Sequence, residues 1–237
     1  MSKFEMAPEA AEYALFQRTG LVRDGRSKWQ RRFAEIGFGK SYETVLREQA
    51  ASEAGDIAQR YFAEMGDIFS ATAPHIPEKT SSVMDIGCGL AGLQVFAHRH
   101  LAANNPRIYL LDRTQLEDKV WYHFKERSAF YNSLALARDT LTRNGVPDGS
   151  ITTIEAPADG KIPVVEPVDL IVSTASWGFH YPIGLYIESV KSILSKDGVV
   201  IVDVRKKTDG LDALRGAFGV VETIADSKKF VTVRCTR

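Results

Sequence analysis

The chain has 237 residues, of which 44% are hydrophobic and 25% are charged, so it can form one α/β domain with additional material and bury a core without disulfide bonds. Its 30 basic and 30 acidic residues give a formal net charge of +0, which excludes any general attraction to nucleic acid or to an anionic membrane. Cys88 and Cys235 lie far apart and predict neither a disulfide framework nor a metal site. With no signal-peptide pattern and no long apolar run, the expected location is the cytoplasm.

Residues 1–75 are expected to be helical and to form a cap over the rest of the chain. One helix is expected over about residues 42–54 and another over residues 56–69, where apolar side chains recur at helical spacing. Asp56 and Gln59 have the spacing of an N-terminal capping box for the second helix. Basic residues dominate positions 18–32, which predicts a solvated segment, with an anion-binding patch near a substrate entrance as the alternative.

A different pattern begins at residue 76. Short apolar runs alternate with helical ones, which predicts parallel β-α-β units with helices on both faces of the sheet. The last two runs, GVVETIA and KFVTVRCT, are joined by residues 226–229, which are too few for a helical crossover and predict an antiparallel hairpin. The predicted fold of residues 76–237 is therefore a seven-stranded, mostly parallel Rossmann-like sheet closed by this hairpin.

A glycine-rich turn between the first strand and the following helix is the strongest chemical signal. The sequence DIGCGLAG places Gly87 and Gly89 where the N-terminal N–H groups of a helix can hold a ligand. The next strand, IYLLD, ends in Asp112, whose carboxylate can accept two hydrogen bonds from a ribose diol. The glycines, with Gly92, also have the spacing of dinucleotide-binding oxidoreductases. Against that alternative, Asp85 puts a carboxylate beside the turn, where it suits an ammonium or sulfonium ligand better than a diphosphate.

Residues 81–237 resemble the class I S-adenosylmethionine-dependent methyltransferases. VMDIGCGLAG is similar to the first motif of this family, although Ala91 stands at the third glycine and Gly92 follows it. VDLIVSTASW is similar to the fourth motif, and LSKDGVVIVDV is similar to the motif around the fifth strand. The resemblance implies S-adenosylmethionine as the cofactor, with Asp85 orienting its amino group and Asp112 holding its ribose. The cofactor contacts that it implies are Asp85, Gly87, Cys88, Gly89, Asp112, Arg113, Ala158 and Ser173.

The segment after the fourth strand, residues 173–182, is the candidate site for the methyl acceptor. His180 titrates near neutrality and is the candidate general base, with substrate binding and a structural role as alternatives. Trp177, Phe179 and Tyr181 are candidate substrate contacts, and ordinary packing is the alternative for them. An aromatic run at residues 121–124 is expected to form an extra helix over the cleft. Basic residues 205–207 follow the fifth strand at the same edge, as a solvated loop or as ligands of an acidic substrate group.

These features favour a methyltransferase that acts on a small molecule, most readily on oxygen, for example in a sugar or natural-product pathway. An aromatic, His-containing loop under a helical cap suits a closed pocket. The alternatives are an RNA- or protein-modifying methyltransferase, which would use the basic stretch, and an NAD(P)-dependent oxidoreductase. The expected partner is a small molecule and neither nucleic acid nor membrane. The oligomeric state is left open, with a homodimer as one option.

Overall fold

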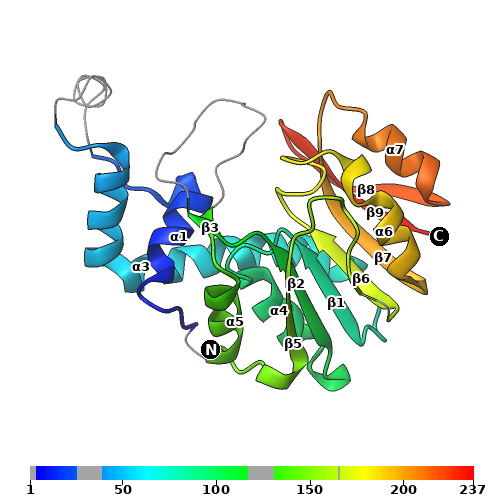
Figure 1. Cartoon of the computed structure of the whole chain (residues 1–237), viewed down its shortest axis with the longest axis horizontal. Coiled ribbons are helices and arrows are strands. Elements are labelled where there is room, and N and C mark those ends of the chain that lie inside the picture. Colours follow the sequence, from blue (N-terminus) through cyan, green and yellow to red (C-terminus); the bar gives the residue numbers. More distant parts are fainter. Residues whose placement is uncertain (1–3, 26–38, 117–130, 165) are drawn as a thin grey trace.

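Figure 1 shows the computed structural model, which describes residues 4–25, 39–116, 131–164 and 166–237. At its centre lies a seven-stranded sheet of order β5-β2-β1-β6-β7-β9-β8. Neighbouring strands are parallel from β5 through β7, and β9 is antiparallel to both β7 and β8, which confirms the predicted sheet and its hairpin. The strands are β1 (Ser82–Ile86), β2 (Arg107–Asp112), β5 (Ile151–Glu155), β6 (Val168–Ser173), β7 (Leu194–Arg205), β8 (Val220–Asp226) and β9 (Phe230–Thr236).

The order of the strands reverses beside β1. β2 and β5 extend the sheet on one side of β1, whereas β6 and β7 extend it on the other. The register aligns Val83 of β1 with Ile108 of β2 and Leu170 of β6. Open α/β sheets bind ligands outside the carboxyl ends of their strands at such a switch point. The ends of β1, β2 and β6 are therefore where a site is expected.

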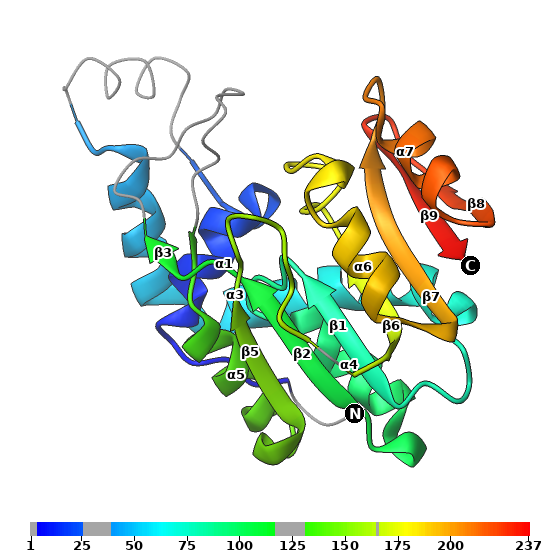
Figure 2. The ribbon, with the colours of Figure 1, turned by 45° about the vertical axis from the view of Figure 1, so that its right-hand side comes forward.

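Helices cover both faces of the sheet and form two hydrophobic cores. One core joins the sheet to α1 (Ala10–Gln17), α3 (Tyr42–Thr72), α4 (Gly92–His100) and α5 (Leu134–Arg143). The other joins it to α6 (Ile187–Ile193) and α7 (Gly210–Ala217), on the opposite side (Figure 2). A short antiparallel pair, β3 (Gln115–Leu116) and β4 (Tyr131–Asn132), stands apart from the main sheet. Short 3-10 turns occur at Thr19–Leu21, Ala73–His75, Ala102–Asn104, Asp148–Ser150 and Ile183–Leu185.

The two helices expected in the N-terminal part are one element, α3, with a break inside it. Ser41 caps its start by accepting a hydrogen bond from the N–H of Thr44 at 3.1 Å. Glu53 has non-helical backbone angles, so the chain bends close to the predicted boundary. The predicted capping box at Asp56 is wrong. The Asp56 carboxylate instead accepts a hydrogen bond from Arg60, one turn along the same helix, at 3.0 Å.

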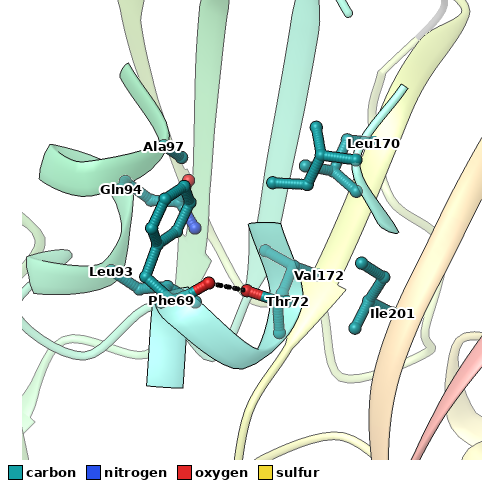
Figure 3. A pocket seen from close by; sticks show the side chains of 9 residues that line it. Phe69, Thr72, Leu93, Gln94, Ala97, Leu170, Val172 and Ile201 are labelled. Carbon is teal, nitrogen blue, oxygen red and sulfur yellow. Dashed lines mark hydrogen bonds between the residues drawn. The ribbon is translucent and has the colours of Figure 1, made fainter. Parts of the chain in front are cut away.

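The N-terminal helices belong to the core of the sheet as well as lying over its edge. Ile57, Phe62 and Met65 of α3 are almost fully buried in the same cluster as residues of β1 and α4. Where the end of α3 meets β6 and β7, it leaves a cavity of only about 10 Å³, bordered by Phe69, Thr72, Leu93, Gln94, Ala97, Leu170, Val172 and Ile201 among others (Figure 3). Such a gap holds about one water and no larger ligand. We therefore expect the sheet to depend on α3 for its stability. The division into a cap over residues 1–75 and a domain over residues 76–237 stays a prediction.

Two expectations fall outside the described residues: the aromatic run at 121–124 and, of the basic stretch at 18–32, residues 26–32. None of the described helices has the length and apolar character that a membrane span requires. Within the same described ranges, no group of three or more His, Cys, Asp and Glu side chains is arranged to hold a metal ion.

Candidate functional site

The turn after β1 has a backbone that only small residues adopt easily. Gly87 and Gly89 have φ angles of 79° and 54°, and Ala91 at the start of α4 has a φ of 58°. The N–H groups of Gly87 and Cys88 both donate to the carbonyl of Leu111 in β2, at 2.7 and 3.3 Å. These bonds hold the turn against the end of β2, next to Asp112. Ala91 adopts a left-handed conformation, which residues with a side chain rarely take.

Three segments that are distant in the sequence pack closely against this turn. A Cβ added to Gly87 would lie 1.9 Å from Ser176 Oγ, and one added to Gly89 would lie 2.6 Å from Gln17 Oε1. A Cβ added to Gly92 would lie 2.4 Å from the ring of Tyr61. The loop after β6, the end of α1 and the middle of α3 therefore meet at the glycine turn.

Tyr61 connects the N-terminal helices to the turn by a hydrogen bond. Its hydroxyl oxygen accepts the N–H of Gly92 at 3.1 Å, and the pair is buried. We expect Tyr61→Phe to lower the free energy of unfolding by about 1–3 kcal/mol, because the buried N–H would lose its acceptor. Denaturant titration measures this change. Tyr109→Phe is the matched control, since it removes only a 3.4 Å contact with the exposed Glu166. Equal stability losses in the two variants would contradict the assignment.

Asp85 is a buried carboxylate with one oxygen lacking a hydrogen-bond partner. Its side chain lies at the end of β1 and the residue is 3% exposed. Oδ2 accepts a hydrogen bond from Gln94 Nε2 at 2.9 Å, whereas Oδ1 has no partner. Burial raises the pKa of Asp85 to about 7, against the lowering effect of the Gln94 hydrogen bond. A buried oxygen of this kind is a ready acceptor for a cationic or N–H ligand.

Asp112 stands beside Asp85 at the end of β2. Its carboxylate accepts the N–H of Gly89 at 2.8 Å and the N–H of Arg113 at 2.7 Å. Burial raises its pKa to about 6, and Glu155, its neighbour in β5, also raises it. The two backbone hydrogen bonds lower the same pKa. The carboxylate is thus held in place by the glycine turn while it keeps acceptor capacity for a ligand.

The other predicted cofactor residues differ in their surroundings. Cys88 is buried, and burial followed by the charges of Asp112 and Asp85 holds the pKa of its thiol well above the ordinary value. Ser173 is fully buried at the end of β6, where its hydroxyl donates to the carbonyl of Ile86 at 2.6 Å. Ala158 is exposed in the loop after β5. Cys88 and Ser173 are therefore buried at the glycine turn, whereas Ala158 lies at the protein surface.

Polar side chains that the sequence motifs do not predict complete the turn: Gln17, Gln94 and Asn132. Gln94 carries a detectable signal, because it is a polar residue inside the apolar run of α4. Gln17 and Asn132 carry none, since α1 and β4 are distant in sequence from the turn. Gln17 Nε2 donates to Asn132 Oδ1 at 3.3 Å, and the Asn132 amide lies close enough to Asp112 to lower the pKa of that carboxyl. Asn132 is 4% exposed, and its Nδ2 has no geometrically acceptable partner.

The loop after β6 is a tight turn built around one carbonyl. Ser176 O accepts the N–H groups of Phe179, His180 and Tyr181 at 3.0, 2.7 and 3.2 Å. Trp177 is fully buried, and its indole N–H donates to the carbonyl of Ile183 at 2.9 Å. Of the predicted substrate contacts, Trp177 therefore packs in the core, whereas Phe179 and Tyr181 are partly exposed.

A pocket of about 330 Å³ lies beside this loop. Its lining comes from the loops after β6 and β7, and includes Gly178, Phe179, His180, Tyr181, Pro182, Ile183, Arg205, Thr208, Asp209 and Gly210. His180 is exposed at the rim, yet the protein around its ring and then the charge of Arg205 hold its pKa below the ordinary value. The lowered pKa favours the neutral form of the imidazole, which can accept a proton.

No family model and no curated protein matches the chain. Among solved structures, the chain is similar to a SAM-dependent methyltransferase from Aquifex aeolicus (TM-score 0.51, 13% identity, covering 73% of this chain and 97% of that one). It is also similar to a precorrin-6y C5,15-methyltransferase from Geobacter metallireducens GS-15 (TM-score 0.49, 19% identity, 76% and 88% covered). A third is a TehB-like SAM-dependent methyltransferase from Corynebacterium glutamicum ATCC 13032 Kitasato (TM-score 0.47, 11% identity, 78% and 98% covered).

At 13% identity, the similarity to the Aquifex protein shows that the fold is shared and shows nothing further. The chain has the Rossmann-like fold of the class I S-adenosylmethionine-dependent methyltransferases.

Proposed function

We propose that this protein is an S-adenosylmethionine-dependent methyltransferase. The observation that carries the proposal is the unpartnered oxygen of Asp85, buried beside the glycine turn. An ammonium group satisfies this oxygen and favours its charged form, whereas a diphosphate at the same turn would be repelled by it. The chemistry of the turn therefore fits the methyl donor better than a nicotinamide dinucleotide.

Different residues of the site would contact different parts of the cofactor. Asp85 would bind the amino group, and Gly87 and Gly89 would let the methionine part approach the backbone. Asp112 would hold the ribose hydroxyls, with the amides of Gln17 and Asn132 beside it. The backbone of Cys88 and Arg113 and the exposed loop at Ala158 would complete the contacts, with Ser173 fixing the turn from below. When bound, the cofactor supplies an electrophilic methyl group on a sulfonium sulfur.

For the acceptor, we propose a small molecule methylated on oxygen. The pocket of about 330 Å³ lies within the range of small-molecule sites. His180 at its rim has a lowered pKa, which favours the neutral imidazole, so it would accept the proton that the acceptor hydroxyl gives up on methylation. The same loop touches the glycine turn through Ser176 and lines the pocket through Phe179, so one loop would contact both the donor and the acceptor. Orientation of the two reactants is the principal task of such an enzyme.

The ribose contact gives a direct test of the proposed cofactor site. We expect Asp112→Asn to weaken the binding of S-adenosylhomocysteine by about 10- to 100-fold, because hydrogen bonds to a charged acceptor contribute about 1.5–3 kcal/mol. Isothermal titration calorimetry measures the change. Asp197→Asn, at an exposed site in the first part of β7, is the matched control and should bind as the parent protein does. Unchanged affinity in Asp112→Asn would remove Asp112 from the site.

A further inference from the structure

Asn132 brings a buried amide to the glycine turn from a separate part of the chain. It belongs to β4, and the pairing of β4 with β3 places it opposite Gln115, three residues after Asp112. Asn132 is 4% exposed, so its side chain is closed off from solvent. The next residue, Ser133, is the N-cap of α5 and accepts the N–H of Leu136 at 3.3 Å. The two-stranded ribbon and the capped helix therefore hold the backbone around this amide.

Gln17 of α1 determines which way the Asn132 amide faces. Gln17 Nε2 donates to Asn132 Oδ1 at 3.3 Å, so the oxygen is turned toward α1 and the nitrogen away from it. Among the described residues, no acceptor lies within hydrogen-bonding geometry of Asn132 Nδ2. Burial raises the pKa of both the Asp112 carboxyl and the Cys88 thiol, and the Asn132 amide partly lowers both. The unpartnered N–H group of Asn132 is therefore beside Asp112 and the glycine turn.

The chemistry beside this amide is complementary to it. Asp112 can only accept hydrogen bonds when it is charged, and the N–H groups of Gly89 and Arg113 already hold its carboxylate in place. Buried donors without a partner are rare in folded proteins, and each requires an explanation. A hydroxyl group can donate to one neighbour and accept from another at the same time. One hydroxyl placed between Asp112 and Asn132 would therefore satisfy both side chains.

Resting on the proposed function, we infer that Asn132 is a second ribose-binding residue of the cofactor site, whose Nδ2 donates to a ribose hydroxyl that itself donates to Asp112. Gln17 is the positioning residue that keeps this donor facing the hydroxyl. The N-terminal helix α1 thereby takes part in recognising the cofactor as well as covering it. The site then distinguishes ribose from deoxyribose more strongly than Asp112 alone would do.

S-adenosylhomocysteine and its two analogues that lack the 2′- or the 3′-hydroxyl test this inference by calorimetry on the full chain. We expect the parent protein to bind at least one analogue about 10-fold or more weakly than S-adenosylhomocysteine. Asn132→Ala should weaken S-adenosylhomocysteine by about 5- to 10-fold, as expected for one hydrogen bond, and should leave the affinity for that analogue nearly unchanged. Gln17→Met keeps an unbranched side chain without the amide and should lose part of the same preference.

Asn144→Ala is the matched control, because it removes the same amide from a place distant from the turn. Asn144 lies at the other end of α5, where its Nδ2 donates to the carbonyls of Glu5 and Thr140 at 2.6 and 2.8 Å. This variant should lose stability and keep the full preference for the ribose. The stoichiometry of each titration reports the folded fraction, so a partly unfolded variant is not mistaken for one with a lost contact.

The outcomes separate this inference from the cofactor proposal. Equal binding of all three ligands by the parent, or an Asn132→Ala variant that weakens all three alike, would overturn the role of Asn132 and leave the cofactor proposal standing. An unchanged preference in Gln17→Met would remove Gln17 as the positioning residue. A parent protein that binds none of the three ligands would overturn the cofactor proposal and this inference with it.

Discussion

The single substitution Asp85→Asn is expected to have two effects: it makes the cofactor-free protein more stable at pH 8, and it weakens cofactor binding. Burial raises the pKa of this carboxyl from 3.8 to about 7. The folded chain therefore holds the proton more tightly than the unfolded chain does. Stability falls as pH rises from about 4 to about 7 and stays reduced above that. Three pKa units correspond to about 4 kcal/mol, the upper bound of the gain at pH 8.

The geometry of the site adds to this gain. The oxygen Gln94 Oε1 is buried without a partner beside Asp85, and the amide of an Asn at position 85 would supply a donor to it. Loss of the negative charge should weaken the binding of S-adenosylhomocysteine by roughly 10- to 100-fold. Denaturant unfolding of parent and variant at pH 4 and pH 8 gives the stability part, and calorimetry gives the binding part. The two proteins should differ little at pH 4.

Asp197→Asn again serves as the control for a change of charge alone. A variant at position 85 that is less stable than the parent at pH 8, or a stability difference that does not depend on pH, would contradict the buried, proton-binding character of Asp85.

Gly87→Ala is expected to cost more than about 3 kcal/mol of stability and to abolish cofactor binding. The residue has a φ of 79°, which side-chain-bearing residues rarely adopt. Its new Cβ would also lie 1.9 Å from Ser176 Oγ and 2.3 Å from Ser176 Cβ. Either the glycine turn or the loop after β6 would have to move, and both belong to the proposed site.

A second substitution separates the two causes. Ser176→Gly removes both atoms that the new Cβ would meet, so the double variant should recover the cost of the clash and keep only the backbone cost of about 1–2 kcal/mol. Unfolding measurements on the four proteins of the double-mutant cycle give the coupling energy. Strictly additive effects would show that the loop after β6 does not touch the turn, and would remove the link between the cofactor and acceptor sites.

The sheet could be predicted from the sequence because its signals are local. Each strand of the parallel part is a short apolar run between turn residues, and residues 226–229 are too few for anything but a hairpin. The sequence predicts two helices over residues 42–54 and 56–69; the structure joins them in α3, with the bend at Glu53 close to the predicted boundary. Asp56 was misread as a cap because a carboxylate within a helix and one at its start look alike in sequence, and only the pairing with Arg60 distinguishes them.

The site residues could be predicted from the sequence only where the pairing of neighbouring strands brings them together. Asp85, Gly87 and Asp112 lie at the ends of paired strands, so their meeting follows from the sheet. Gln17, Tyr61 and Asn132 arrive from α1, α3 and β4, and tertiary packing alone brings them to the turn. Trp177 shows the converse: its position three residues before His180 predicts a pocket wall, whereas its ring is buried in the core.

The central claim is that the turn at Asp85 and Asp112 binds a cationic adenosyl amino acid. Calorimetric titration of the full chain with S-adenosylmethionine and, separately, with NADH tests it most directly. We expect saturable binding of the methyl donor, with an affinity that rises between pH 6 and pH 8 as Asp85 loses its proton, and no binding of the dinucleotide. Tight binding of NADH together with no heat from the methyl donor would contradict the account.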